Sequence, residues 1–352
     1  MDPRIKTILE YAIMAPSGDN CQPWRFTVDD RQIELYNDPD ADDSLYNLKQ
    51  RASLIAHGAL LENIRLAAPA VGLDATIKEF PTPDNPDHIA TLNLVDGPSE
   101  EASLFKAIPQ RHTNRERYEA VKISDSQIQQ WQELSIQNGD SIWIGHQPEQ
   151  IKQLAGLLSL NDKLVFSVPD LHRFLFEQIR WNDTQARQTG DGLDIKTLGL
   201  NAMDKQAFRF LKNWPLIALL NKVGFSNIIQ LKAKQTVNSA SAIAVLAIPG
   251  SQPIDYLRGG MLWQRLQLQL AAEGLTSQPI AGLACLMQSQ AEGALAGKLS
   301  EEQQDAVKKT RVELQKIAGF DKSSVILTMF RIGKGRDVTR ALRRPVESFL
   351  RS

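Results

Sequence analysis

The densest group of residues that could contact a planar ligand lies near the start of the chain. Residues 15–24 read Ala-Pro-Ser-Gly-Asp-Asn-Cys-Gln-Pro-Trp and follow a predicted helix. A Pro-Ser-Gly turn at a helix exit presents backbone and short polar groups, and these allow a flat ring to approach closely. The alternative is an ordinary helix-to-strand turn above a buried Trp24. Such a turn does not require the polar residues Asn20 and Gln22.

Two later segments are rich in arginine and are suited to a phosphate. Residues 111–115 read Arg-His-Thr-Asn-Arg, in which the guanidinium groups offer fork-shaped donors and Thr113 adds a hydroxyl. Taken alone, each of the two segments is also typical of a solvated charged surface. The second is the end of the chain, in which basic residues outnumber the two acidic ones, Asp337 and Glu347. The basic residues are Arg331, Lys334, Arg336, Arg340, Arg343, Arg344 and Arg351.

Other kinds of site find little support in the sequence. The histidines are scattered and none stands at the i, i+4 spacing of a helical zinc pair, so no metal site is expected. Cys21 and Cys285 do not form a CxxC pair, which would indicate zinc or thioredoxin-type chemistry. The chain has no G-x-x-x-x-G-K-[ST] run, and residues 333–335, Gly-Lys-Gly, lack the context of a dinucleotide fingerprint.

Hydrophobic periodicity predicts a mixture of helices and strands around these segments. We expect an irregular insertion over about 160–236, and a Gly-Pro-Ser break at 97–99 is the best internal boundary, with a new helix starting near Ser103. This mixture indicates an α+β or α/β protein. We predict helices over 4–15, 48–71, 148–159, 255–273 and 301–318, and strands over 24–28, 33–36, 75–79, 89–95, 141–145, 241–248 and 324–332.

Two of the predicted long helices resemble each other. Residues 58–73, GALLENIRLAAPAVGL, match residues 260–275, GMLWQRLQLQLAAEGL, without a gap at a separation of 202 residues. Gly58 matches Gly260, and Leu66 matches Leu268. Any two buried helices that end in glycine share some letters, so the match alone leaves chance and duplication both open.

The overall composition is that of an average globular protein. The formal net charge of −1 provides no general attraction for nucleic acid or an anionic membrane, so we expect neither as a partner. The first 13 residues lack the pattern of a signal peptide, and no run approaches the length of a membrane span. We therefore expect a cytoplasmic protein.

The segments described above, together with residues 274–282, Gly-Leu-Thr-Ser-Gln-Pro-Ile-Ala-Gly, resemble the nitroreductase-like flavoprotein family. The first looks like the family's A-P-S-x-x-N-x-Q-P-W run, and 111–115 is similar to its R-x-S-x-R/K start. Residues 274–282 resemble the G-L-x-x-x-P-x-x-G continuation that follows its long dimer helix. Arg343-Arg344-Pro345 resembles its R-R-P ending. The resemblance implies FMN as the cofactor.

By this resemblance each segment has an implied role. Arg111 and Thr113 would hold the phosphate and ribityl chain, and Arg115 would lie near the N1–C2 edge of the ring. The backbone of Ala281 and Gly282 would face the reacting edge, and no catalytic side chain is assigned. Many family members carry a carboxylate at the position of Ala281, which puts nitroreductase activity in doubt. The implied cofactor-binding residues are Pro16, Ser17, Gly18, Asn20, Arg111, His112, Thr113, Arg115, Pro279, Ile280, Ala281, Gly282, Arg343 and Arg344.

The segments are divided between two parts of the chain. Residues 1–102 supply the Pro-Ser turn, and residues 103–352 supply the other three segments, whereas 135–139 in the second part contain no second Pro-Ser turn. The expected fold is therefore α+β and nitroreductase-like, with two fused half-units forming a pseudo-dimer of antiparallel-rich sheets and long central helices. The insertion would form a lid through Trp181, Arg187, Trp214 and Phe225.

The implied function is that of an FMN-dependent NAD(P)H oxidoreductase, in which a hydride passes through flavin N5 to a small nitro, quinone or related acceptor. The alternatives are a non-catalytic FMN-binding protein for storage or sensing, and a structural module that has lost the cofactor. Because the pseudo-dimer interface is internal, the chain is expected to be a monomer or a homodimer.

Overall fold

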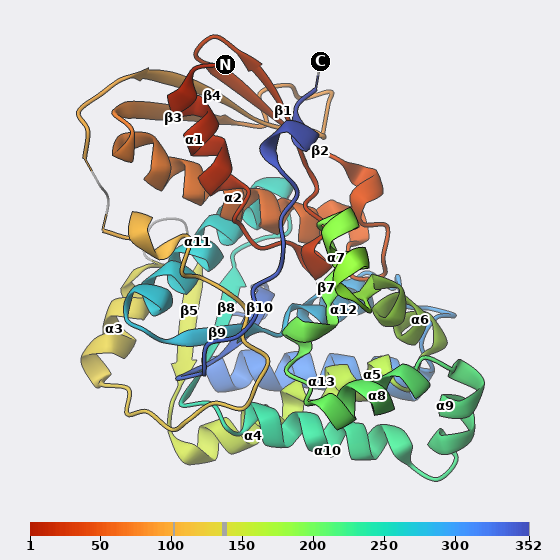
Figure 1. Ribbon diagram of the computed structural model, residues 1–352. Helices are drawn as coiled ribbons and strands as arrows, with labels where there is room; N and C mark the ends of the chain where they lie inside the picture. The colour runs from red at the N-terminus through yellow and green to blue at the C-terminus, as the bar shows by residue number, and fades with distance from the viewer. Residues whose placement is uncertain (101–102, 136–138, 352) are drawn as a thin grey trace.

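The computed structural model describes residues 1–100, 103–135 and 139–351. Residue 102, where the predicted first half ends, and residues 136–138 of the segment compared with the Pro-Ser turn lie outside the described residues. The chain folds around two four-stranded antiparallel sheets flanked by helices (Figure 1). The predicted α+β class with antiparallel sheets and long central helices is confirmed.

The first sheet is built from residues before 97. Its strand order is β1-β2-β4-β3, all antiparallel. The hairpin pairs Phe26 with Leu35 and Val28 with Ile33, and the alternation of apolar and polar residues directs Phe26, Ile33 and Leu35 into the core. The elements are α1 (Pro3–Ala12), β1 (Trp24–Asp29), β2 (Gln32–Asn37), α2 (Arg51–Ala70), β3 (Leu73–Glu79) and β4 (His88–Asp96).

The second sheet repeats this arrangement with later residues. Its order is β5-β8-β10-β9, so the first and second strands pair, the fourth follows, and the third lies at the edge, as in the first sheet. Every residue of β8 is buried, because helices cover both faces of the strand. The elements are α3 (Asp125–Glu133), β5 (Ser141–Gly145), β8 (Ala242–Ile248), α11 (Pro253–Ala272), β9 (Thr276–Pro279), α12 (Ala281–Ala291), α13 (Glu301–Ala318) and β10 (Val325–Gly333).

The long helices α2 and α11 pack against each other between the sheets (Figure 1). A Cβ atom at Gly58 would overlap the carbonyl oxygen of Leu257, and one at Gly260 would overlap that of Ile55. Both helices have 20 residues and begin 202 residues apart. By the same shift, Leu257 is the counterpart of Ile55 and Gly260 is the counterpart of Gly58. The two contacts are therefore reciprocal, as they are across a twofold axis.

Polar side chains repeat this reciprocity one turn further along. Gln264 donates to the side chain of Asn63 at 2.7 Å, and Arg265 donates to Glu62 at 2.9 Å. By the same shift of 202, Gln264 is the counterpart of Glu62 and Arg265 is the counterpart of Asn63. Glu62 therefore contacts the counterpart of Asn63, and Asn63 contacts the counterpart of Glu62. Glu62 is fully buried and also accepts from Arg65, which satisfies its carboxylate.

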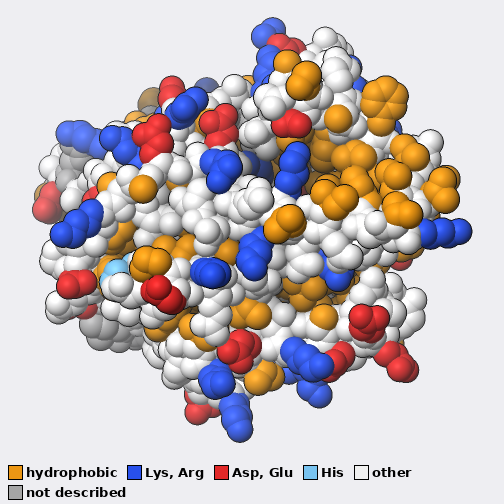
Figure 2. Space-filling model, turned by 90° about the horizontal axis from the view of Figure 1, so that it is seen from below, with side chains coloured by type: hydrophobic (Ala, Val, Ile, Leu, Met, Phe, Trp, Pro, Cys, Tyr) orange, Lys and Arg blue, Asp and Glu red, His pale blue; other side chains and the backbone are white. Residues whose placement is uncertain are grey.

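The insertion lies between β5 and β8, where the first sheet has only the turn between β1 and β2. Its α5–α10 portion packs around its own apolar cluster, which includes Phe166, Phe176 and Ile217. The lower face of the molecule carries hydrophobic side chains on the side where α8, α9 and α10 lie (Figure 2). The elements are α4 (Pro148–Leu158), α5 (Leu160–Val165), α6 (Pro169–Gln178), β6 (Ile179–Arg180), α7 (Asp183–Thr189), β7 (Leu193–Asp194), α8 (Ala202–Phe210), α9 (Trp214–Asn221) and α10 (Phe225–Val237).

The segments that follow β4 and β10 cross to the opposite sheet. Thr113 forms a parallel bridge with Ser277 of β9, and the end of the chain bridges to β1 through Phe26 and Leu350. A helix was expected to start near Ser103. The chain there contains only one 3₁₀ turn, over Phe105–Ala107. These crossings bring residues from both parts of the chain to a common place.

Candidate functional site

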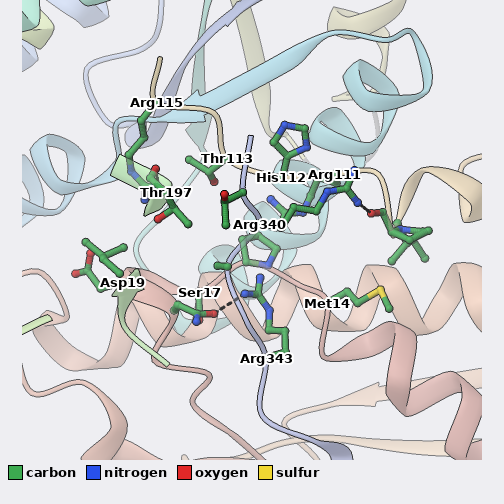
Figure 3. Close-up of a pocket in the computed structure, with 17 residues that line it drawn as sticks. Met14, Ser17, Asp19, Arg111, His112, Thr113, Arg115, Thr197, Arg340 and Arg343 are labelled. Atoms are coloured by element: carbon green, nitrogen blue, oxygen red, sulfur yellow. Dashed lines mark hydrogen bonds between the residues drawn. The ribbon is translucent and has the colours of Figure 1, made fainter. Parts of the chain in front are cut away.

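A cavity of about 300 Å³ lies where the turn after α1, the 108–115 segment and the C-terminal segment meet (Figure 3). Its size falls at the lower end of the range for small-molecule sites. In this view Arg115 lies on the left, Arg340 and Arg343 lie near the middle, and Arg111 lies to the right. The cavity is lined by Met14, Pro16, Ser17, Asp19, Asn20, Ile108, Pro109, Arg111, His112, Thr113, Arg115, Leu193, Thr197, Thr339, Arg340, Ala341 and Arg343.

The turn after α1 has an unusual backbone. Asp19, Asn20 and Gln22 have φ angles of 42°, 62° and 55°, in the left-handed region. Asp and Asn tolerate this region better than most residues, but Gln does not share that preference. The Ser17 hydroxyl accepts the Gln22 N–H at 2.9 Å and so holds the turn closed. Backbone strain of this kind is concentrated at functional sites.

Asn20 and Gln22 hold the C-terminal segment in place. Asn20 donates through Nδ2 to the Leu342 carbonyl at 2.9 Å. Gln22 donates to the Gly190 carbonyl at 2.8 Å and accepts the Arg344 N–H at 3.0 Å. These polar residues therefore join the turn to segments more than 160 residues away, which explains their presence better than a simple helix-to-strand turn does.

Arg343 and Arg344 point in different directions. Arg343 lines the cavity and donates to the carbonyls of Ile13 and Ala15, each at 3.1 Å, and to the side chain of Asn20. Its positive charge lies at the C-terminal end of α1, where the helix dipole favours a cation, and burial lowers the pKa of Arg343 to about 10. Arg344 bonds to the carbonyls of Cys21 and Gln22 and lies over the ring of Phe349. It supports the C-terminal segment and does not line the cavity.

Arg111 is the least satisfied cation of the cavity. Its Nη1 donates to Gln267 at 3.3 Å, and its buried Nε has no hydrogen-bond partner. Burial and, to a smaller extent, the charges of Arg343 and Arg340 lower the pKa of Arg111 to about 9. Among the described residues, no carboxylate pairs with any of these three arginines. An anion is the ligand whose charge would compensate these three cations.

The other end of the cavity holds one cation and one carboxyl group. Arg115 donates to the Thr197 carbonyl at 3.3 Å, and burial lowers the pKa of Arg115. Burial, helped by the neighbouring Asp42 and opposed by Arg115, raises the pKa of Asp19 to about 6. This carboxyl can therefore hold or release a proton near neutral pH.

The segment 276–282 lies beside the cavity and not in its lining. The Asn114 N–H donates to the Ser277 carbonyl at 3.2 Å, which places Thr113 against β9. The Ile280 N–H is bonded to the Met329 carbonyl at 2.7 Å. Ala281 and Gly282 begin α12, so their N–H groups belong to the first turn, which has no partners within the helix.

The structure thus brings together a subset of the residues implied by the resemblance. Gly18, Pro279, Ile280, Ala281, Gly282 and Arg344 do not line the cavity, whereas Pro16, Ser17, Asn20, Arg111, His112, Thr113, Arg115 and Arg343 do. The lining residues Asp19, Thr197 and Arg340 were not in the implied set. Asp19 stands inside the Pro-Ser run itself, and that position was the signal that could have identified it.

The insertion contributes to the cavity through residues other than the predicted lid. Leu193 and Thr197 line it, whereas Trp181 lies near Phe176 and Trp214 lies near His172. Phe225 packs against the same apolar cluster, and Arg187 is exposed. None of these four side chains lines the cavity, and the three aromatic ones pack against the insertion's own apolar cluster. The lid stays a prediction.

The described residues contain no group of three or more His, Cys, Asp or Glu side chains that could hold a metal ion. No helix within them has the length and apolar character needed to cross a membrane.

Comparisons with known proteins connect the chain to two mycobacterial proteins. No protein-family model matches the chain. An uncharacterized protein of Mycobacterium tuberculosis is 23% identical over 280 residues, which are 79% of this chain and 39% of that protein. The M. tuberculosis protein named "Putative NAD(P)H nitroreductase acg" is 25% identical over 277 residues, 78% of each chain. The resemblance to nitroreductase-like proteins is thus confirmed in sequence.

The solved structures that resemble the chain do so remotely. The crystal structure of a nitroreductase with bound FMN from Desulfitobacterium hafniense is 14% identical to this chain. It aligns with a TM-score of 0.37 over 70% of this chain and 95% of that one.

Proposed function

We propose that this relative of the nitroreductase-like proteins is an FMN-dependent oxidoreductase that uses NAD(P)H to reduce a small nitro, quinone or related acceptor. The observation that carries the proposal is the cavity, in which a cluster of unpaired arginines lies at one end and Arg115 with Asp19 lies at the other. An elongated ligand with a phosphate and a flat ring matches such a site.

The residues at the anion end fit a terminal phosphate. A phosphate monoester accepts several charge-assisted hydrogen bonds, and each contributes about 1.5–3 kcal/mol. Arg111 would give its unpartnered Nε, and Arg343 and Arg340 would add charge. Thr113 would add a hydroxyl. The buried His112 Nε2, which also has no partner, is available to the same group.

The residues at the other end fit the ring. FMN, when bound, supplies a ring that accepts a hydride from a pyridine nucleotide and passes electrons to an acceptor. The Arg115 guanidinium would favour negative charge on the edge of the ring nearest to it. Asp19 would hold or give up a proton at its carboxyl oxygen, because its pKa of about 6 lies close to neutral pH.

We also propose that the chain consists of two homologous halves, about 1–102 and 103–352, that share this one site. The common strand order of the two sheets and the reciprocal contacts of α2 with α11 support it.

We propose a cytoplasmic location as well. The free cysteines, Cys21 and Cys285, support it, since thiols stay reduced in the cytoplasm.

A second candidate function is FMN binding without turnover, for storage or sensing. The lining residues Leu193 and Thr197 favour it, since they come from the insertion, which thereby covers part of the cavity and limits the approach of a nicotinamide or an acceptor.

The absorbance spectrum of the purified chain tests both candidates. We expect stoichiometric flavin with the absorbance bands of bound FMN, and anaerobic NADH or NADPH should bleach them within seconds. Bound flavin that keeps its colour with both nucleotides would support storage. A colourless protein that takes up no added FMN would contradict both functions.

A further inference from the structure

The outer surface of α8, α9 and α10 carries a group of exposed apolar side chains. Met203 and Val223 are 82% and 81% exposed. Figure 2 shows hydrophobic side chains gathered on this side of the lower face. We define the insertion surface as the exposed residues Met203, Phe210, Leu216, Leu219, Val223, Ile228 and Leu231.

These side chains are not needed for the packing of the insertion itself. The same helices already bury a separate inner face, on which Phe208, Leu220 and Ile229 pack around Phe166 and Phe176. The helices therefore carry apolar residues on both faces. A second apolar face exposed to water costs solubility without adding to the core, and contiguous patches of this kind mark interaction sites.

The stretch of chain that carries the insertion surface is rich in basic residues. Between residues 201 and 236 the chain has one acidic residue, Asp204, and it forms an ion pair with Lys232 at a long 3.9 Å. Within the described residues, the other basic side chains of this stretch have no carboxylate partner. The basic residues are Lys205, Arg209, Lys212, Lys222, Lys232 and Lys234.

We propose that the insertion surface binds the face of a lipid bilayer that contains anionic headgroups. Helices that lie in a bilayer interface combine apolar side chains, which enter the acyl boundary, with Lys and Arg, which contact the headgroups. Long basic side chains reach the headgroups while their stems remain among apolar groups. The net charge of −1 suggested no attraction to such a surface, but attraction depends on the local charge within a Debye length.

A second copy of the chain fits this surface less well. A twofold interface would place the same patch on both sides, so the six basic residues of one copy would face those of the other. The centres of protein interfaces are also depleted in lysine. Charge complementarity therefore favours an anionic lipid surface.

Sedimentation of the full chain with vesicles tests the proposal. We expect binding to vesicles that contain phosphatidylglycerol, weaker binding to vesicles of phosphatidylcholine alone, and a loss of binding as salt is raised. Leu219→Asp together with Val223→Asp should abolish sedimentation. Lys205→Gln together with Lys212→Gln should weaken binding to anionic vesicles about fivefold for each charge removed.

Matched controls distinguish binding through the insertion surface from non-specific hydrophobic binding to lipid. Val95 and Val312 are 57% and 53% exposed on other elements, so Val95→Asp and Val312→Asp should leave vesicle binding unchanged. Circular dichroism should show that all variants stay folded. Failure to sediment at any lipid concentration would overturn the proposal. The proposal would also be overturned if the parent chain did not bind vesicles and light scattering showed a dimer that Leu219→Asp disrupts.

Discussion

Arg111 shows how a single side chain can indicate a ligand. Its buried Nε has no partner, its pKa is lowered to about 9, and its charged neighbours Arg340 and Arg343 repel it. In the folded chain this arrangement is unfavourable, and a bound phosphate would relieve it. A residue that costs stability on its own is most simply explained by the ligand it holds.

Replacing Arg111 with Gln should weaken FMN binding by about ten- to a hundredfold, which corresponds to the loss of one charge-assisted contact. Fluorescence titration of FMN into the apoprotein measures the effect. Arg336→Gln is the matched control, because Arg336 is exposed and does not line the cavity. An unchanged dissociation constant for Arg111→Gln would show that the phosphate lies elsewhere.

The Asp19 carboxyl should make stability depend on pH. Its pKa is about 6 in the folded chain and near 3.8 in the unfolded chain, so the folded state holds the proton more tightly. Stability should therefore fall as pH rises from about 4 to 6, and remain lower above that range. Asp19→Asn should stabilise the apoprotein by about 2 kcal/mol at pH 7.5 and have little effect at pH 4.

Thermal denaturation at the two pH values measures this difference. Asp30→Asn is a suitable control, since Asp30 has a similar φ of 45° and is exposed in the β1–β2 turn. Equal effects of Asp19→Asn at both pH values would contradict the proposed titration.

Sequence motifs predicted some lining residues of the cavity better than others. Arg111, Thr113, Arg115 and Arg343 lie within recognisable motifs. Thr197 and Leu193 come from an insertion without a motif, and only the path of the folded chain brings them to the cavity. Arg344 was implied by the R-R-P ending together with Arg343, but successive side chains of an extended segment point to opposite sides.

At the scale of elements, the contact of α2 with α11 is the most demanding feature. Gly58 and Gly260 allow the two backbones to touch, and a Cβ at either position would overlap a carbonyl oxygen of the other helix. The helices cannot separate without breaking the Glu62–Arg265 and Asn63–Gln264 contacts. The pair thus fixes the position of one sheet relative to the other.

Gly58→Ala should destabilise the protein by several kcal/mol, because the overlap can be relieved only by moving a helix. Gly156→Ala is the matched control: it lies in α4 with nothing near its Cβ position, and alanine should stabilise that helix by roughly 0.5–1 kcal/mol. Urea denaturation of the two variants measures both effects. A Gly58→Ala variant as stable as the parent would mean that the helices are further apart.

Long periodic helices and alternating strands were predictable, and short or uniformly apolar elements were not. Helix α12 was missed because Leu283 to Ser289 are all buried, so it has no polar face to create a period. Strand β9 has four residues and ends at Pro279, too short for a clear alternation. The helix expected near Ser103 is a single turn because Pro109 follows soon after it.

The whole molecule joins its two sheets within one chain, and this should affect how it unfolds. In a dimer of separate subunits, the thermal midpoint rises with protein concentration. Here the α2–α11 contact is internal, so the midpoint should not change over a hundredfold range of concentration. Differential scanning fluorimetry at several dilutions measures it, and a steadily rising midpoint would indicate that a further copy contributes to stability.

Chain length alone left the number of units open, and the match between 58–73 and 260–275 left chance open. The reciprocal contacts and the shared strand order could be seen only once the chain was folded. The reason is physical: the similarity in sequence lies in two helices whose backbones touch, while the sheets tolerate many apolar residues at each position.

The insertion between β5 and β8 has no counterpart between β1 and β2, where the strands are joined by a tight turn. In an assembly of identical subunits, any such addition would appear twice and would crowd both sites. Under the proposed division into two homologous halves, a single chain would remove that constraint, because a change in one half would not be imposed on the other. One half could then specialise in supplying a corner of the pocket while the other acquired a new outer surface.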